Sequence, residues 1–388
     1  MRRAVIVGGG IGGLAVAIAL RKVGYEAHVY ERAAELREVG SGMSLWPNAL
    51  RCLREIAPGA LGKLQADNQS LLRLLMKDTE GAVMKAIRFP ASDFTAIAVH
   101  RAELHSALAE LIPSGCLHLD HSFSSLDVRG RSAVVKFSNG AELEADLVVG
   151  SDGIHSAVRA AIGLDCSLSS RGYVVWRGMS RINAQSDLKH LGLEQVGDFS
   201  ESYGHGQRVG IIHLGPGRVH WYATANISRQ EWDLPHEEEV LERFAGWHAP
   251  IPELIRNSDS IVLSPVHDRL LTLPWTKGPV ALLGDAAHPV SPDFGQGACL
   301  AIEDAVVLAA SLQSHAEVGE ALARYEQARH RRCREIVFTS RETGRLVQLQ
   351  NRVLVRMRKH FVSMAPAALT TYWLQRCWNF YPPSLATA

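Results

Sequence analysis

A glycine-rich segment near the amino terminus constrains the fold more than any other part of this sequence. The apolar run 4–7 leads directly into the segment 8–13, Gly-Gly-Gly-Ile-Gly-Gly, and the apolar residues 14–20 behind it have the length and composition of a helix. A second strand-like run, residues 26–30, ends at Glu31. Strand, G-x-G-x-x-G loop, helix, strand and terminal acidic residue in this order predict the βαβ unit that binds a dinucleotide.

Each glycine of this motif has a distinct physical task. Gly8 permits a tight turn, Gly10 lets the backbone approach a pyrophosphate, and Gly13 lets the helix pack closely on the strand. The N–H groups at the start of the helix attract the anion. Glu31 suits the 2′-hydroxyl of an adenosine ribose and repels a 2′-phosphate, so we expect the ADP half of FAD or NAD rather than NADP. The alternative, a glycine-rich loop without a ligand, is disfavoured by the matching strand, helix and acidic residue.

Composition places the chain among ordinary globular proteins. Its 388 residues are 47% hydrophobic and 21% charged, and 41 basic against 40 acidic side chains give a net charge of +1. This balance gives no reason to expect nucleic acid or an anionic membrane as a partner. The 6 cysteines form no C-x-x-C pair. They therefore indicate neither a zinc site nor a disulfide framework, and we expect a reduced, cytoplasmic protein.

The middle of the chain predicts β-structure. Residues 71–88 are typical of a hairpin with its turn at 78–81. Further strand-like runs with glycine turns between them cover residues 117–128, 133–137, 143–149, 173–182, 208–214 and 218–226. We expect these strands to form one antiparallel sheet that makes a second domain.

The carboxyl-terminal third returns to α/β character. It contains a buried strand at 279–285, a helix that begins near 298, and a long helix over 320–347. Residues 351–378 alternate between basic and apolar, and their arginines and lysine interrupt every stretch long enough to span a bilayer. Helices packed on the outside of the nucleotide-binding domain are favoured. A helix that lies on a membrane surface stays open as the alternative.

A second informative stretch places Asp152-Gly153 after the strand-like run 146–150, with Arg159 on the succeeding helix. Either a ligand lies against this backbone, or Asp152 forms an Asx-turn in an ordinary strand-turn-helix connection. The residues alone leave both interpretations open. Arg37 also has two: beside a glycine-rich turn, it reaches a cofactor phosphate or ribityl chain, or it lies in solvent.

The third informative stretch begins at Gly284-Asp285. Asp285 stands at the carboxyl end of a strand, where open α/β sheets bind ligands, and its carboxylate can accept hydrogen bonds from ribityl hydroxyls. The segment 295–297, Gly-Gln-Gly, opens a helix whose N–H groups stabilise negative charge, such as the N1–C2=O locus of a reduced flavin. His288 has no second metal ligand spaced near it. We expect a loop residue close to the cofactor there, and no metal site.

These stretches, in this order and spacing, resemble the class A flavoprotein monooxygenases of the para-hydroxybenzoate hydroxylase type over nearly the whole chain. The family's Asp-Gly motif, associated with FAD and NAD(P)H binding, falls on Asp152 and Gly153, and its Gly-Asp motif on Gly284 and Asp285. The segment 99–104 resembles the one whose arginine contacts FAD, which makes Arg101 a candidate. The predicted cofactor-binding residues are Gly8, Gly10, Gly13, Glu31, Arg32, Arg37, Arg101, Asp152, Gly153, Arg159, Gly284, Asp285, Pro292, Gly295, Gln296 and Gly297.

The resemblance implies an α/β fold in which a Rossmann-like FAD domain is interleaved with an antiparallel substrate-binding sheet and followed by C-terminal helices. The expected boundaries are 1–70, 98–168 and 274–388 for the FAD domain with its helices. Residues 71–97 and 169–273 are expected to form the substrate domain.

The resemblance also implies a reaction. NADPH or NADH binds transiently and reduces FAD, molecular oxygen adds at flavin C4a, and the hydroperoxide delivers one oxygen atom to a small aromatic or heteroaromatic substrate. An FAD-dependent epoxidase or oxidative tailoring enzyme is the alternative within this class. A flavin-binding protein without turnover is the alternative outside it, and Asp152-Gly153, Asp285 and the segment 295–297 argue against it.

Candidate substrate-side residues lie on the later strands. Alternation in the run 218–222 places Arg218, His220 and Tyr222 on one face, with Val219 and Trp221 on the other. A phenol, imidazole or guanidinium on the inner face can deprotonate or orient an aromatic hydroxyl, so Arg208, His220 and Tyr222 are the predicted catalytic residues. The alternative is that they are ordinary strand residues.

Overall fold

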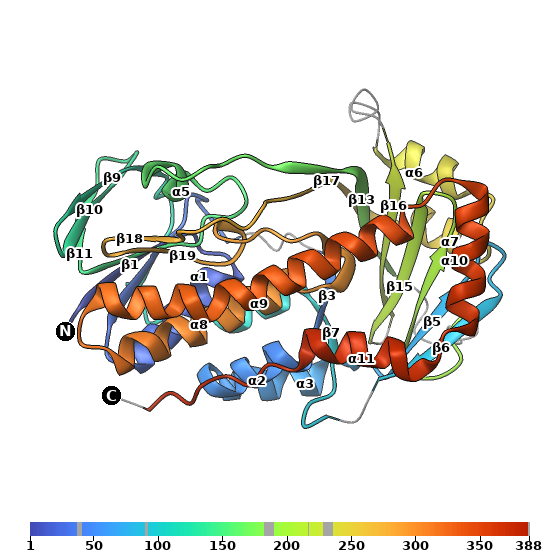
Figure 1. Ribbon diagram of the computed structural model, residues 1–388, viewed down its shortest axis with the longest axis horizontal. Helices are drawn as coiled ribbons and strands as arrows, with labels where there is room; N and C mark the ends of the chain where they lie inside the picture. The colour runs from blue at the N-terminus through green and yellow to red at the C-terminus, as the bar shows by residue number, and fades with distance from the viewer. Residues whose placement is uncertain (37–40, 90–91, 182–189, 216, 228–235, 387–388) are drawn as a thin grey trace.

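The computed structural model describes residues 1–36, 41–89, 92–181, 190–215, 217–227 and 236–386. One half of the molecule is built on a six-stranded sheet in the order β18-β19-β12-β1-β2-β8, in which every pair but β18 with β19 is parallel (Figure 1). These strands are β1 Arg3–Val7, β2 Glu26–Tyr30, β8 Leu117–His118, β12 Leu147–Gly150, β18 Thr276–Lys277 and β19 Val280–Leu282. The uniformly buried runs of β12 and β19 suit a sheet covered on both faces.

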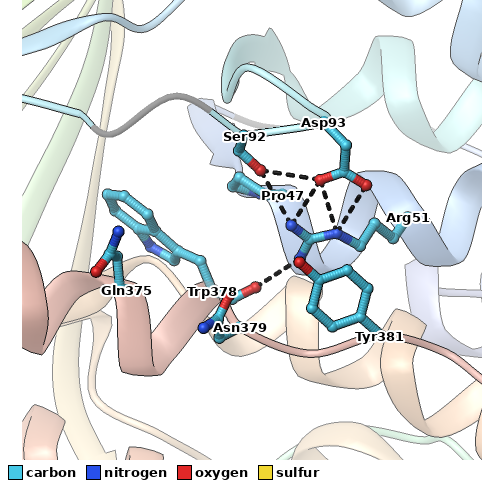
Figure 2. Close-up of a pocket in the computed structure, with 8 residues that line it drawn as sticks. All are labelled: Pro47, Arg51, Ser92, Asp93, Gln375, Trp378, Asn379 and Tyr381. Carbon is cyan, nitrogen blue, oxygen red and sulfur yellow. Dashed lines mark hydrogen bonds and ion pairs between the residues drawn. The ribbon is translucent and has the colours of Figure 1, made fainter.

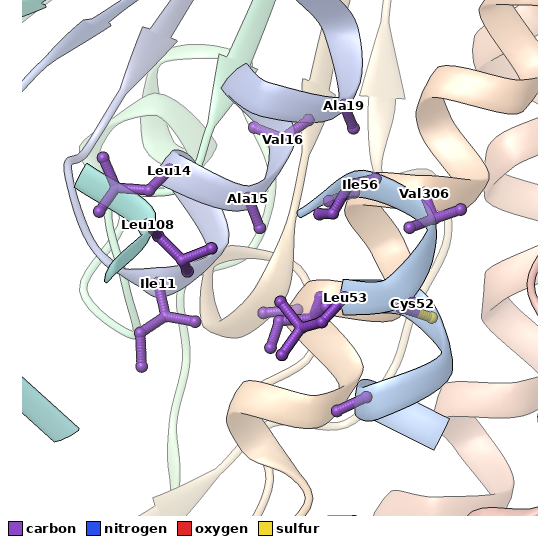
Figure 3. Packing of buried hydrophobic residues seen from close by; sticks show 14 of the residues in the cluster. Ile11, Leu14, Ala15, Val16, Ala19, Cys52, Leu53, Ile56, Leu108 and Val306 are labelled. Carbon is purple, nitrogen blue, oxygen red and sulfur yellow. The ribbon is translucent and has the colours of Figure 1, made fainter. Parts of the chain in front are cut away.

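Apolar helices cover this sheet. Helix α1 packs against α2 and α8, and small residues such as Ala15 and Ala19 let the helices approach while Leu53 and Val306 fill the space between them (Figure 3). The helices of this half are α1 Ile11–Lys22, α2 Pro47–Ile56, α3 Pro58–Asp67, α4 Arg101–Ala109, α5 Ala157–Ala161 and α8 Gly297–Ser314. Two short 3-10 turns, η2 Gly284–Ala286 and η3 Pro292–Phe294, lead into α8.

The other half contains a seven-stranded sheet in the order β17-β13-β16-β15-β14-β5-β6. Its strands are antiparallel except for β14 and β5, which pair in parallel. They are β5 Arg73–Lys77, β6 Val83–Arg88, β13 Ser169–Arg181, β14 Asp198–Tyr203, β15 Gln207–Gly215, β16 Arg218–Asn226 and β17 Ser258–Asp268. The predicted hairpin of residues 71–88 is β5 and β6. The domain boundaries proposed from the sequence stay a prediction.

The prediction of one antiparallel sheet is wrong for its first part. Strands β9 Phe123–Arg129, β10 Ser132–Phe137 and β11 Glu142–Ala145 form a three-stranded sheet of their own, and β8 and β12 join the parallel sheet. Strand β12 pairs with β1 and β19 inside the parallel sheet. Its side chains are all buried because that sheet is covered on both faces, whereas a meander strand would have one face in solvent. A further small sheet joins β3 Gly42–Leu45, β7 Ile97–His100 and β4 Gln69–Ser70.

The seven-stranded sheet has two different faces. Its outer face carries Val219 and Trp221 into a core with α6 His236–Phe244 and α7 Ile251–Arg256. Its inner face carries the alternate residues, among them Tyr222 and Ile212, which pack toward the cores shared with the parallel-sheet half. The alternation predicted for β16 is therefore confirmed.

Three helices complete the chain. Helix α9 Val318–Val347 runs from the parallel-sheet half to the seven-stranded sheet, α10 Arg352–Met364 stands at the outer edge of that sheet, and α11 Ala367–Trp378 returns toward α2 (Figure 1). Within the described part of the chain, α8 is long and apolar enough to cross a membrane. Because about 67% of its apolar window is buried in the protein, α8 fits the description of a core helix.

Candidate active site

The glycine loop between β1 and α1 is shaped by close backbone contacts. Gly8 has φ +108°, and a side chain there would place Cβ 2.5 Å from the carbonyl oxygen of Ser151. A Cβ on Gly13 would overlap the carbonyl oxygen of Gly8. By contrast, a Cβ on Gly10 would meet nothing within 4 Å. Gly10 therefore faces open space at the start of α1, where a diphosphate has room to reach the backbone.

Polar side chains flank this loop. Glu31 accepts hydrogen bonds from Gly9 N at 2.6 Å and from Ala33 N at 3.0 Å, which holds its carboxylate over the loop. Arg32 is exposed beside it, and Arg101 is exposed at the start of α4. The predicted residue Arg37 lies outside the described residues.

The Asp152-Gly153 turn supports the site from behind. The carboxylate of Asp152 accepts from Ser156 Oγ at 2.6 Å and from two backbone N–H groups at the start of α5, at 2.7 and 3.0 Å. Arg159 is buried and donates to Asp165 O at 2.6 Å and to Ala286 O at 3.3 Å. Both side chains thus brace the turn and the η2 segment. The guanidinium of Arg159 bonds backbone carbonyls, and its direct contact with the cofactor stays a prediction.

Asp285 lies in η2 at the carboxyl edge of the parallel sheet. Its side chain is accessible to solvent, yet enough protein surrounds it for desolvation to raise the pKa of its carboxyl group. The charges of His288, Arg101 and Arg269 act in the opposite direction, so Arg101 lies close enough to influence this carboxylate. An accessible, partly desolvated carboxylate at this edge fits the predicted contact with ribityl hydroxyls.

A fully buried ionic network holds this turn in place. Asp304 on α8 accepts from Gly284 N at 2.9 Å, from His288 Nε2 at 2.6 Å and from Arg329 Nε at 2.6 Å. Burial by itself raises the pKa of Asp304, but the charges of His288 and Arg329 outweigh it and lower that pKa to about 2. Burial alone lowers the pKa of His288, and Asp304 reverses this and raises it well above the ordinary value. Arg329 also lies 2.6 Å from Glu303, as an ion pair.

The structure corrects one expectation about His288. Asp304 and Cys333, distant in sequence, lie with it in a cluster whose ligand-type atoms are all within 4.8 Å of one another. The carboxylate of Asp304 is already engaged by Arg329 and by the Gly284 N–H. The cluster therefore works as an internal ion network that fixes the η2 turn, rather than as an accessible set of ligands.

Unpaired buried donors gather at the amino end of α8. Gln296 accepts from Asn48 Nδ2 at 3.0 Å, while its own Nε2 has no partner among the described residues. The same holds for Ser291 Oγ and for the indole Nε1 of Trp46, which lies 3.2 Å from the position of a Cβ on Gly295. Gly295 itself has φ +60°. Together with the uncapped N–H groups of α8, these donors fit the polar edge of an isoalloxazine ring.

The residues present therefore fit FAD along its length. Open backbone at Gly10 and the carboxylate of Glu31 suit the ADP half, Asp285 suits the ribityl chain, and the amino end of α8 suits the ring. Glycines and helix ends supply most of this site, as in other dinucleotide sites.

The inner face of the seven-stranded sheet carries a buried polar network beside η3. Arg208 on β15 lies 3.0 Å from Asp293 and 3.5 Å from Glu201. Tyr222 and Tyr203 both donate hydrogen bonds to Glu201, and Tyr173 donates to Asp293 at 2.7 Å. Burial, with the nearby charge of Glu201, raises the pKa of Tyr222 well above its ordinary value. The phenol of Tyr222 is thus a proton donor, not a base.

His220 is buried on the same face. Its Nδ1 lies 3.1 Å from Gly178 O, and a Cβ on Gly42 of β3 would overlap its ring, so the imidazole is enclosed between two strands. Burial lowers the pKa of His220 to about 3. The ring is therefore neutral near pH 7, and its assignment as a proton-transferring residue stays a prediction.

Arg177 differs from Arg208 although both lie on the inner face. Arg177 stands opposite Tyr222 in the strand register, and desolvation lowers the pKa of its guanidinium. No hydrogen bond or ion pair of Arg177 is present among the described residues, and its side chain is only half-buried. Arg208, in contrast, is buried between two carboxylates.

The other end of the inner face is aromatic. The ring of Trp46 stacks on Trp378 at 4.6 Å and meets Phe89 edge-on at 5.4 Å, while Phe89 lies 5.8 Å from Phe199 of β14. Ile212 pairs with Phe199 across the sheet. The loop that contains residues 291–297 therefore borders a polar network at Asp293 and an aromatic cluster at Gly295.

A cavity of about 490 Å³ opens beside Trp378 of the aromatic cluster (Figure 2). Arg51 lines the cavity and donates to Asp93 at 2.6 Å, to Ser92 at 3.0 Å and to Trp378 O at 2.8 Å. This arrangement ties α2 to the end of α11. The lining residues are Pro47, Arg51, Ser92, Asp93, Gln375, Trp378, Asn379 and Tyr381.

Sequence reasoning missed the groups that make the inner face specific. Asp293 and Glu201 were not assigned a role because a carboxylate on a strand or a loop is common, and only the fold brings them to Arg208. Arg177 follows the buried Trp176 in β13 and belongs to no sequence motif, so no role was assigned to it. The period-two alternation of β13 was the only available signal for its face.

Known proteins resemble this chain along its length. The family described as FAD binding domain matches residues 2–340. Aurachin C monooxygenase/isomerase of Stigmatella aurantiaca is 36% identical over 368 residues, covering 92% of this chain and 93% of that protein. The 2-heptyl-3-hydroxy-4(1H)-quinolone synthase of Pseudomonas aeruginosa is 32% identical over 375 residues, covering 94% of each.

The fold is shared with a crystal structure of Klebsiella pneumoniae HpxO complexed with FAD and uric acid. The TM-score is 0.87 at 25% identity, and the match covers 98% of this chain and 97% of that one. The resemblance inferred from the motifs, the fold class and the FAD cofactor are confirmed by these matches, and NAD(P)H is the usual reductant of the class. This chain belongs to the class A FAD-dependent monooxygenases, the flavoprotein hydroxylases of aromatic and heteroaromatic rings.

Proposed function

We propose that this enzyme hydroxylates a heteroaromatic ring that carries an oxo or hydroxyl group and an apolar side chain, of the 2-alkyl-4-quinolone class. The observation that carries the proposal is the unpaired guanidinium of Arg177, on an inner face where Arg208 is neutralised by two carboxylates. An oxygen acceptor on the substrate would give Arg177 the charge-assisted hydrogen bond that the described residues do not provide.

The aromatic cluster supports an apolar side chain. Trp46, Phe89 and Phe199 form an apolar cluster at the end of the sheet away from Arg208, so a substrate with one polar and one apolar end matches both ends of the face. Among the relatives, the quinolone synthase is named for its product, a heptyl-substituted 3-hydroxy-4(1H)-quinolone. Such a compound has a polar ring oxygen at one end and an apolar alkyl chain at the other, which matches the polar and aromatic ends of the inner face.

The residues of the chain orient the ring and exclude water. FAD, when bound, takes two electrons from NAD(P)H and activates molecular oxygen, one atom of which enters the substrate while the other leaves as water. Arg177 would hold the ring oxygen, and Tyr222 and Tyr203 keep Glu201 hydrogen-bonded beside it. The amino end of α8 would stabilise negative charge at the ring of the bound cofactor.

The experiment compares substrates and one side chain. Product formation and peroxide release are measured with 2-heptyl-4(1H)-quinolone, the same quinolone without its alkyl chain, and uric acid. We expect the alkylquinolone to give the highest ratio of product to NAD(P)H consumed. Equal or better coupling with uric acid would contradict the proposed class.

Arg177→Gln tests the anchor itself. Loss of one charge-assisted hydrogen bond, about 2 kcal/mol, predicts a roughly thirtyfold rise in KM, with FAD content unchanged. Arg177→Lys should recover part of the loss because it restores the charge. Arg181→Gln is the matched control on the same strand, since Arg181 is exposed and pairs with Asp259. An unchanged KM in Arg177→Gln would remove Arg177 from the substrate site.

A cytoplasmic location belongs to this proposal as an expectation. All 6 cysteines are free in the structure, and burial raises the pKa of the Cys52 and Cys299 thiols above the ordinary value. Free thiols in place of disulfides support a reducing compartment.

A further inference from the structure

One face of α10 is apolar and exposed. Its side chains follow the spacing of a single helical stripe, and they are between 45% and 69% exposed. Isolated exposed apolar residues are ordinary, but a contiguous stripe along a whole helix marks an interaction surface. The stripe consists of Val353, Leu354, Met357, Phe361 and Met364.

The opposite side of α10 is firmly attached to the protein. Arg358 is buried and donates to Val347 O and to Gly204 O, both at 2.8 Å. Lys359 pairs with Asp78 at 2.7 Å, and Lys85 donates to Val362 O at 3.3 Å. The stripe is therefore exposed because α10 is held with that side outward, at the outer edge of the molecule (Figure 1).

Positive charge accompanies the stripe. Arg352, Arg356 and His360 are exposed and follow one another at intervals of four residues, which places them in one row beside the apolar residues. The segment 351–388 contains 5 lysines and arginines and no acidic residue. Removing those 5 from 41 leaves 36 basic against 40 acidic residues in the rest of the chain, so the net charge of +1 hides a basic end on an acidic body.

We propose that α10 is a membrane-surface helix that docks this enzyme on anionic phospholipid, with its apolar stripe among the acyl chains and its basic row at the headgroups. Apolar and basic faces in this arrangement are those of interfacial helices. A second copy of this chain fits the surface less well. In a two-fold contact the row of Arg352, Arg356 and His360 would face its own copy, and like charges repel.

The exposed helix α10 is also connected to the candidate active site. Helix α11 follows α10 directly, and its last residue, Trp378, lines the cavity of about 490 Å³ and stacks on Trp46. Trp46 reaches Gly295 at the amino end of α8. The segment that would lie on the membrane is thus continuous with the aromatic cluster. The docking proposal stands on α10 alone and does not depend on the proposed substrate class.

Vesicle flotation of the FAD-loaded full chain tests the proposal. Vesicles of pure phosphatidylcholine are compared with an equal mixture of phosphatidylcholine and phosphatidylglycerol. We expect flotation with the anionic vesicles and little with the neutral ones, and added salt should weaken it. Phe361→Glu should reduce binding by at least about tenfold, and Arg356→Gln by roughly fivefold.

Leu270→Glu is the matched control, because Leu270 is 65% exposed but lies outside α10. It should float like the wild type. Equal FAD content in all variants shows that each is folded. Failure of the wild type to float, equal flotation on neutral vesicles, or wild-type flotation of Phe361→Glu would overturn the proposal. A wild-type dimer in sedimentation velocity that Phe361→Glu converts to a monomer would instead assign the stripe to a second copy.

Discussion

The carboxyl edge of the parallel sheet and the inner face of the seven-stranded sheet are built for their ligands by different means. At the edge, backbone does most of the work: open space at Gly10, free N–H groups at α8, and a turn clamped by a buried ion network. On the inner face, side chains from several strands meet. The charge of Arg208 is paired there, whereas that of Arg177 has no ion-pair partner among the described residues. The first arrangement recognises a shape shared by all dinucleotides. In the proposed function, the second would recognise charge and length, which differ between substrates.

The largest effect is expected from the clamp beneath the cofactor edge. Asp304→Asn keeps the volume but removes the charge that pairs with His288 and Arg329. Breaking a buried ion network by removing one member costs about 3–5 kcal/mol, since the remaining charges stay desolvated. Chemical unfolding followed by circular dichroism measures the loss, and flavin retention should fall with it.

Asp127→Asn is the comparison for this change. Asp127 pairs with Arg129 at 2.8 Å, and both side chains are more than half exposed, so we expect less than about 1 kcal/mol. Similar losses in the two variants would mean that the network under η2 contributes no more than a surface pair.

A smaller effect should separate cofactor binding from folding. Gly10 has φ −72°, which any residue adopts, and a Cβ there meets no protein atom within 4 Å. Gly10→Ala should therefore leave the unfolding free energy nearly unchanged. A methyl group in the space left for the pyrophosphate should cost one charge-assisted hydrogen bond, about 1.5–3 kcal/mol, or roughly tenfold to hundredfold in FAD affinity.

Titration of the apoprotein with FAD measures this affinity. Gly59→Ala is the matched control, because Gly59 in α3 also has nothing within 4 Å of an added Cβ and lies outside the predicted site. If both variants bound FAD as the wild type does, the loop at Gly10 would not be the phosphate site.

The difference between the two regions also explains what the sequence could reveal. Gly8, Glu31 and Asp285 occupy the edge that their motifs predicted, because a turn or a strand end is determined by residues within a few positions. The pairing of β12 with β1 and β19 was not predicted, because an apolar run indicates that a strand is buried but not which strands it pairs with.

Tertiary contacts decided the remaining assignments. Arg159 donates to a backbone carbonyl, and His288 bonds Asp304 on α8. Neither contact has a signature in the local sequence. On the inner face, alternation gave the correct side for Tyr222, but the partners of Arg208 come from η3 and β14. Ion pairs between side chains of different elements depend on how those elements pack. The sequence alone therefore did not predict them.

The smallest effect concerns the neutral imidazole of the inner face. Burial lowers the pKa of His220 to about 3 in the folded protein, against about 6.5 in the unfolded chain. Between these values the unfolded state binds the proton and the folded state does not, so stability is complete above pH about 6.5 and is lost as the pH falls toward about 3. From pH 7.5 to 5.5 the loss from this one group is about 1.4 kcal/mol. Unfolding of the wild type and His220→Gln at the two pH values measures it by difference, which cancels the other titrating groups. Identical pH dependence in both proteins would show that folding does not lower the pKa of His220, and it would strengthen the prediction that the imidazole carries a proton beside Tyr222.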